Sequence, residues 1–159
     1  MQRIRPELVL GLLVAGFACS SNGESRPPEL TGPRIPVTIE TEGGPVTFQA
    51  EVVDTPESRA RGLMFRESMG RLEGMLFLFP DEAQRSFWMK NTLIPLDMLF
   101  IRSDRTILGV AENAVPKTTS SRRVEGGSQF VLEINGGLSK ELGLKAGQKV
   151  TFYAPVPSR

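Results

Sequence analysis

Apolar and polar residues alternate in two neighbouring segments of this 159-residue chain, Val37–Thr41 and Val46–Val52. Alternation with a period of two puts the apolar side chains of a strand on one face. The turn-forming residues Gly43-Gly44-Pro45 lie between the two segments. The pattern therefore predicts a β-hairpin.

A helix is predicted directly after this hairpin. Asp54 or Thr55 can cap its N-terminus, and Pro56 suits its first turn because an N–H at that position would have no partner within the helix. The helix is expected to run to about Phe65. Gly62 lies inside this range and makes the position of the helix end less well defined.

The rest of the chain is a series of short apolar runs. Gly74–Phe79 is continuously apolar and stops at Pro80, which is typical of a strand buried on both faces. Thr118–Gly127 is polar and is interpreted as a surface loop. Further elements are expected as strands at Phe87–Met89, Met98–Ile101, Ile107–Ala111, Phe130–Ile134 and Val150–Tyr153, and as a short helix at Leu138–Leu142. Many short strands with one or two small helices predict an α+β domain, mainly antiparallel β, with a sandwich or barrel-like form.

The N-terminal residues have a different pattern. A stretch containing Arg3 and Arg5 precedes the apolar run Leu8–Ala18, which ends directly before Cys19. Eleven residues rise about 16 Å as a helix, roughly half of what a bilayer core requires. Residues 1–18 are therefore predicted to be a signal peptide and not a transmembrane span.

Cys19 is the only cysteine of the chain. Its position resembles that in a bacterial lipoprotein signal, in which the cysteine becomes the first residue and carries acyl chains. Gly16 stands where such signals usually have Leu, and the alternative is an ordinary secretory peptide that leaves a free thiol. An unpaired thiol is a liability in an oxidising compartment, which favours lipidation. Ser20 resembles the residue of lipoproteins sent to the outer membrane, where the domain would face the periplasm.

Composition separates a tether from a folded domain in the chain beyond the signal peptide. Ser20–Pro36 is rich in Ser, Pro, Gly and Glu, so residues 19–36 are interpreted as a lipidated N-terminus with a flexible tether, and residues 37–159 as a single β-rich domain. Residues 1–18 hold two of the 19 basic and one of the 18 acidic side chains, so 17 of each remain. This balance predicts no nucleic-acid partner. The chain has no histidine, which excludes a Ser-His-Asp triad and a His-based zinc site, and no cofactor is expected.

Four short motifs stand out along the chain: Arg61–Arg66, Gly74–Phe77, Phe87–Thr92 with Pro95–Asp97, and Val131–Gly137. Together they resemble one family, known as domain of unknown function 192 or uncharacterised protein family 0127. The resemblance extends from about Val46 to Phe152 and implies a small β-rich domain, often exported, with no established activity. Gln148 stands where relatives often have Asp, which removes one candidate carboxylate.

The segment from Trp88 to Thr92 is the main candidate for a binding site. Trp88 can stack on a sugar or another planar ligand, and Lys90 and Asn91 can hydrogen-bond to an anionic or hydroxylated group. The structural alternative is that Lys90 is only solvated and Asn91 only holds a turn. Arg61 can either reach the same site to hold a carboxylate or phosphate, or stabilise the end of the first helix.

Asp97 and Glu133 are the acidic residues of interest. Asp97 has apolar neighbours in sequence and is expected to be partly buried, either paired with Lys90 or Arg61 or acting in catalysis. Glu133 can face solvent or line the same cleft as Asp97, and Glu112 is a third candidate. Two carboxylates in one cleft would permit hydrolysis of a glycosidic bond, since that chemistry needs no histidine.

Five methionines lie between Met64 and Met98. Thioethers bind Cu(I), but this spacing fits no compact ligand motif and favours core packing, so no metal site is expected.

The leading interpretation is a cell-envelope lipoprotein whose domain binds a small molecule, a glycan or an envelope protein without catalysis. The alternative is a metal-independent hydrolase that uses Asp97 and Glu133, and a further option is an assembly scaffold that makes contacts through Thr118–Gly127. The binding residues are expected to be Trp88, Lys90, Asn91 and Asp97, supported by Arg61 and Glu133.

The lipoprotein interpretation predicts that the mature chain begins with an acylated Cys19. Mass spectrometry of the mature N-terminal peptide should show the acyl mass on this residue. An unmodified thiol would contradict the interpretation and leave ordinary secretion in its place.

Overall fold

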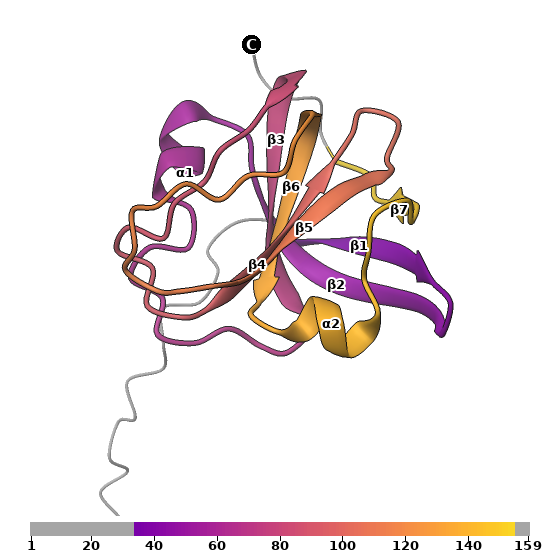
Figure 1. The fold of residues 1–159 in the computed structure, drawn as a ribbon, viewed down its shortest axis with the longest axis horizontal. Coiled ribbons are helices and arrows are strands. Elements are labelled where there is room, and N and C mark those ends of the chain that lie inside the picture. Colours follow the sequence, from indigo (N-terminus) through magenta and orange to yellow (C-terminus); the bar gives the residue numbers. More distant parts are fainter. Residues whose placement is uncertain (1–33, 155–159) are drawn as a thin grey trace, which may run out of the picture.

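Seven strands form a single sheet in the order β5-β4-β6-β3-β2-β1-β7 (Figure 1). The computed structural model describes residues 34–154, so the signal peptide, Cys19 and most of the tether lie outside the described residues. The strands are β1 (Arg34–Thr41), β2 (Gly44–Val53), β3 (Glu73–Gln84), β4 (Leu96–Ile101), β5 (Ile107–Ala114), β6 (Gly127–Asn135) and β7 (Val150–Thr151), and the helices are α1 (Pro56–Arg61) and α2 (Leu138–Leu142). Neither helix of the described range is long and apolar enough to cross a membrane.

The predicted hairpin is confirmed as β1–β2, with Val37 opposite Phe48. The sheet curls so that its edge strands β5 and β7 approach each other at one end. Two hydrogen bonds join these edges, from the Ile107 N–H to the Gln148 carbonyl and from the Val150 N–H to the Arg105 carbonyl, both at 2.9 Å. The result is a half-barrel with mostly antiparallel pairing and two short helices. The predicted fold class is confirmed.

One pair of strands departs from the antiparallel pattern. β2 and β3 run parallel, with α1 in the connection between them, although no βαβ unit was expected from the sequence. β3 also continues past Pro80 to Gln84, because a register shift between Leu78 and Ala83 accommodates the proline within the ladder to β6.

Several predicted element bounds are wrong, and one predicted strand is absent. β1 begins at Arg34, within the stretch interpreted as the tether. α1 stops at Arg61 and does not reach Phe65, since Gly62 follows with φ 47°. β7 is shorter than the predicted Val150–Tyr153. The predicted strand Phe87–Met89 is absent, and only Phe87 forms an isolated bridge, to Arg122.

The buried apolar residues form two clusters, one on each face of the sheet. The inner cluster fills the half-barrel and includes Phe48 and Leu99. The outer cluster includes Met75, Met98 and Phe100 and lies under α1 and the segment that follows β3. Alternation along β4 and β6 assigns neighbouring residues to opposite clusters.

Asp97 is fully buried on the inner face and holds the start of α2. Its carboxylate accepts hydrogen bonds from the N–H groups of Asn113 (2.6 Å), Gly137 (2.9 Å) and Ser139 (2.7 Å), and from the Ser139 hydroxyl (2.5 Å). Within residues 34–154 these partners include no cation, so the expected pairing with Lys90 or Arg61 is wrong. The carboxylate replaces the missing side-chain cap of α2 and ties it to β4 and β5.

Replacing Asp97 by Ala should therefore destabilise the domain. Three backbone donors and one hydroxyl would lose their acceptor in a buried place, which should lower the free energy of unfolding by about 4 kcal/mol. Urea denaturation followed by circular dichroism measures this change. Ser139→Ala, which removes one donor and leaves the carboxylate with three backbone partners, should cost only about 1–2 kcal/mol. Equal effects of the two substitutions would contradict the role assigned to Asp97.

Candidate functional site

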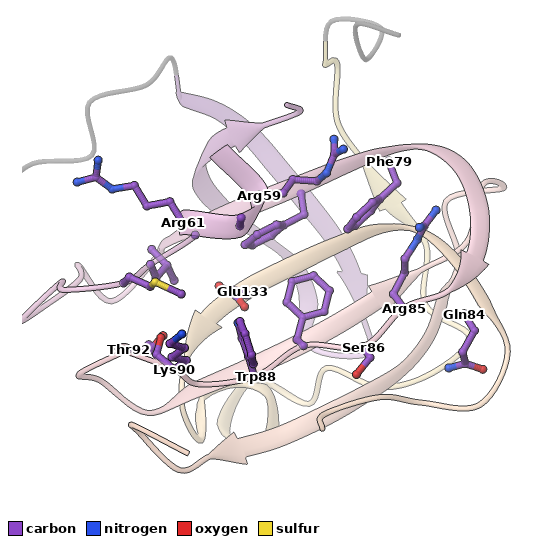
Figure 2. A pocket seen from close by; sticks show the side chains of 16 residues that line it. Arg59, Arg61, Phe79, Gln84, Arg85, Ser86, Trp88, Lys90, Thr92 and Glu133 are labelled. Atoms are coloured by element: carbon purple, nitrogen blue, oxygen red, sulfur yellow. The ribbon is translucent and has the colours of Figure 1, made fainter. Parts of the chain in front are cut away.

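A pocket of about 400 Å³ opens on the outer face of the sheet (Figure 2). Its walls come from α1 and the turn after it, from β3, and from the irregular segment that follows β3, and β6 contributes one residue to its floor. The lining residues are Arg59, Ala60, Arg61, Gly62, Leu63, Met64, Phe77, Phe79, Gln84, Arg85, Ser86, Phe87, Trp88, Lys90, Thr92 and Glu133.

Aromatic contacts hold the irregular wall in place without a strand ladder. The ring of Phe87 meets those of Phe77, Phe79 and Phe100 edge to face, at centroid distances of 5.0, 6.3 and 5.9 Å. Such pairs add stabilisation beyond the apolar area that they bury. Phe87 therefore anchors the wall to the sheet.

Gly62 shapes the opposite wall. Its φ of 47° lies in the left-handed region, and a Cβ at this position would lie 3.2 Å from Cζ of Phe77. Glycine thus ends α1 and lets the chain pass close to that ring. The short helix itself buries none of its residues, so it covers the outer face only in part and leaves the pocket open.

Glu133 lies on the pocket floor. Its side chain is only 4% exposed, and it has no hydrogen-bond partner among residues 34–154. In the sheet it stands between Met75 of β3 and Met98 of β4. Burial in these apolar surroundings raises the pKa of its carboxyl from 4.5 to about 8. At neutral pH the floor is therefore an uncharged carboxylic acid, which can both donate and accept a hydrogen bond.

Two arginines of the pocket are held against Phe79. The guanidinium carbons of Arg85 and Arg59 lie 4.1 and 5.0 Å from its ring centroid. Arg59 also donates to the Leu78 carbonyl at 2.9 Å, and Arg85 to the Ser128 carbonyl at 3.3 Å. These contacts fix both positive charges at one end of the pocket.

The other two cations, Arg61 and Lys90, lie at the mouth. The Lys90 ammonium is 5.3 Å from the centre of the Trp88 ring. Figure 2 shows the Arg61 side chain extending outward from α1. Within the described part of the chain, neither side chain forms an ion pair or hydrogen bond, so both charges are available to a ligand.

Four of the six predicted site residues line this pocket: Trp88, Lys90, Arg61 and Glu133. Asn91 does not line it. Its φ of 56° and the hydrogen bond from the Thr92 N–H to the Met89 carbonyl (3.1 Å) place Asn91 in a turn, with its side-chain amide directed to the Met64 sulfur (3.9 Å).

Asp97 is separated from the pocket by the sheet. It is paired with Ile134, whereas Glu133 is paired with Met98, so the two carboxylates point to opposite faces. Asp97 and Glu133 therefore do not share the single cleft that a paired-carboxylate hydrolase needs. The third candidate, Glu112, is exposed on β5 and does not line the pocket.

The residues that sequence reasoning missed are mainly arginines and phenylalanines. Arg59, Arg85 and Phe79 come together only through the parallel pairing of β2 with β3 and the bend after β3, neither of which was expected. The triplet Arg85-Ser86-Phe87 could have been included from the sequence, because its cation and its aromatic ring directly precede the candidate residue Trp88.

The methionines do not gather in the pocket. Met75, Met89 and Met98 are buried in the outer cluster, and only Met64 lines the cavity. This placement agrees with the core-packing interpretation.

The fold and site define a small β-rich half-barrel domain with a basic, aromatic pocket on its outer face. The chain belongs to the DUF192 family, described as "Uncharacterized ACR, COG1430", whose model matches residues 37–152. The search of curated proteins finds no match.

Two solved structures share the fold. A protein of unknown function from Novosphingobium aromaticivorans DSM 12444 is 43% identical, with a TM-score of 0.72 over 74% of this chain and 84% of its own. A protein of Sinorhizobium meliloti 1021, described as a possible transcription regulator, is 38% identical, with a TM-score of 0.74 over 78% of this chain and 97% of its own.

The raised pKa of Glu133 predicts how stability depends on pH. Between pH 4.5 and about 8 the folded state keeps a proton that the unfolded state releases, so the free energy of unfolding falls as pH rises. The full effect is at most about 5 kcal/mol. Glu133→Gln should be nearly as stable as the parent chain at pH 5 and more stable by several kcal/mol at pH 8.5, as measured by urea denaturation. The exposed Glu112→Gln serves as control and should show no such divergence. Parallel pH profiles for the parent chain and Glu133→Gln would contradict the buried-acid assignment.

Proposed function

We propose that the domain is a non-catalytic binding module for a small anionic ligand with a planar or apolar body. The observation that supports this most directly is the buried Glu133, without a partner among residues 34–154, at the floor of a cavity with aromatic walls and a cationic mouth. Carboxyls whose pKa is strongly shifted by burial are concentrated at functional sites.

The pocket has a gradient of polarity that matches such a ligand. Phe77, Phe79 and Phe87 provide an apolar wall for a ring or short chain, and Trp88 offers an exposed aromatic face at the mouth. Lys90 and Arg61 favour a carboxylate, sulfonate or phosphate at the outer end of the ligand. The protonated Glu133 would bind a carbonyl or hydroxyl at its inner end.

The predicted lipoprotein signal indicates where in the cell the domain would bind its ligand. With Cys19 acylated, the domain would be anchored in the cell envelope and would sample ligands outside the cytoplasm. The equal numbers of basic and acidic residues beyond the signal peptide support a small ligand over a nucleic acid.

A matched pair of fluorescent probes tests the proposal. The anionic probe 8-anilinonaphthalene-1-sulfonate should bind to the folded domain, and its uncharged counterpart N-phenyl-1-naphthylamine, which lacks only the sulfonate, should bind more weakly. Arg61→Ala combined with Lys90→Ala should weaken binding of the anionic probe about tenfold or more and leave the neutral probe almost unchanged. Trp88 is the only tryptophan, so quenching of its emission locates the probe at the mouth.

The same titration has a defined pH dependence. Above about pH 8 the Glu133 carboxylate would ionise and repel the sulfonate, so affinity for the anionic probe should fall. Glu133→Gln should retain its affinity at pH 9. Lys145→Ala removes an exposed cation outside the pocket and should change nothing. Equal affinity for both probes, or no response to the double substitution, would refute the proposed ligand class.

A further inference from the structure

The pocket mouth belongs to a wider surface that we name the aromatic–basic rim, made of Phe65, Trp88 and Val115 with Arg61, Lys90 and Lys117. The three apolar side chains are 59%, 51% and 57% exposed. Exposure of one such residue is ordinary, whereas several in one place mark an interaction surface.

Backbone hydrogen bonds place the three segments of this rim side by side. The Phe65 N–H donates to the Asn91 carbonyl at 2.8 Å, and the Lys117 N–H donates to the Thr92 carbonyl at 3.1 Å. The turn that carries Trp88 and Lys90 therefore lies between the loop of Phe65 and the loop of Val115. In Figure 1 these loops gather at the left of the molecule, away from β7.

Phe65 is held exposed by its surroundings. Its φ of 64° lies in the left-handed region, which is costly for a bulky residue. The next residue, Arg66, is fixed by an ion pair with Glu51 of β2 at 2.6 Å, in which both side chains are largely buried. The fold thus keeps an aromatic ring in solvent in a strained backbone conformation.

We infer that the aromatic–basic rim docks onto an anionic membrane surface. Exposed aromatic rings interleaved with lysine and arginine suit the interface of a bilayer, where rings enter the headgroup layer and cations bind lipid phosphates. The three cations of the rim lie in the same segments as its apolar side chains, and Glu67 is the one acidic residue within two positions of Phe65 in sequence.

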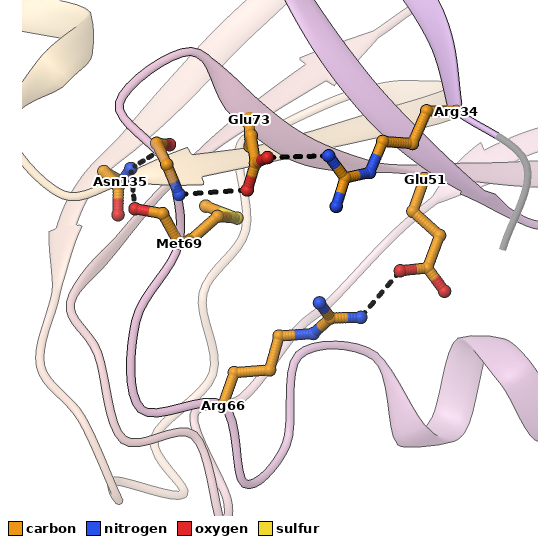
Figure 3. Close-up of polar contacts among 7 residues, drawn as sticks. Arg34, Glu51, Arg66, Met69, Glu73 and Asn135 are labelled. Atoms are coloured by element: carbon orange, nitrogen blue, oxygen red, sulfur yellow. Dashed lines mark hydrogen bonds and ion pairs between the residues drawn. The ribbon is translucent and has the colours of Figure 1, made fainter. Parts of the chain in front are cut away.

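The place where the chain enters the domain supports a membrane over another partner. Arg34 begins β1, binds Glu73 at 2.7 Å and stands opposite Glu51, which binds Arg66 beside Phe65 (Figure 3). The chain therefore arrives on the side of the rim. The fifteen residues that follow the predicted anchor Cys19, up to Arg34, span at most about 54 Å. A tether of this length confines the domain near the bilayer, so weak contacts suffice for docking.

Vesicle binding tests the inference. The chain is used without residues 1–19, so that it lacks Cys19 and cannot be lipidated. Vesicles of phosphatidylglycerol and phosphatidylcholine in equal parts should bind the protein, and pure phosphatidylcholine vesicles should bind it much less. Phe65→Ser with Val115→Ser should weaken binding about tenfold or more, and each of Lys90→Ala and Lys117→Ala about fivefold. Tyr153→Ser removes an aromatic residue that is 88% exposed near β7, beyond the rim, and should have no effect.

A second readout fixes the orientation. Lipids brominated near the headgroup should quench Trp88, the only tryptophan, when the domain binds. Binding without quenching, binding that ignores lipid charge, or a Phe65→Ser/Val115→Ser variant that binds normally would each overturn the inference. Phe65 and Val115 do not line the pocket, and Glu133→Gln should bind vesicles as the parent chain does. Failure of docking is therefore distinguishable from failure of the proposed ligand site.

Discussion

The alternation of side chains along β6 is the constraint on which the rest of the structure depends. This strand is paired on both sides, with β3 and with β4, so its register is fixed from two directions. Leu132 and Ile134 enter the closed core, whereas Val131 and Glu133 face outward. A shift by one residue would bury Glu133 inside the half-barrel, where its carboxyl would face hydrocarbon with no pocket to open into. β4 pairs with β6 so that Asp97 stands opposite Ile134 and Met98 opposite Glu133, which puts Asp97 and Glu133 on opposite faces of the sheet.

The two faces of the sheet differ in how well they are covered. The inner face is closed by the curl of the sheet and by α2, which the buried carboxylate of Asp97 holds in place. The outer face is covered by α1, which buries no residue, and by a segment anchored through Phe87. The thin cover leaves a cavity above Glu133. The desolvated Glu133 has no partner among the described residues and lowers the free energy of unfolding at neutral pH. Proteins commonly keep such destabilising residues where function requires them.

Apolar alternation, continuous apolar runs and turn residues were sufficient to predict the hairpin of β1 and β2 and the centres of β3 to β6 from the sequence, because these strands are organised by local hydrophobic pattern. The pattern failed at Phe87–Met89, where contacts of Phe87 with rings distant in sequence decide the backbone path. It also gave no means of deciding which face each acidic residue occupies, since that depends on the pairing of β4 with β6. Of the six predicted site residues, Trp88, Lys90, Arg61 and Glu133 line one pocket, whereas Asn91 and Asp97 do not. The phenylalanine wall and the arginines on Phe79 depend on long-range packing.

The fixed and the free cations divide the pocket into two functional parts. Arg59 and Arg85 are stacked on Phe79 and bonded to backbone carbonyls, so they form a rigid wall whose charge is partly used within the protein. Arg61 and Lys90 have no such partners among the described residues and stand beside Trp88, at the boundary with the aromatic–basic rim. A domain docked through that rim would turn these two cations toward the headgroup layer. A ligand that enters the pocket would meet these free charges at the mouth first and the neutral acid at the floor last.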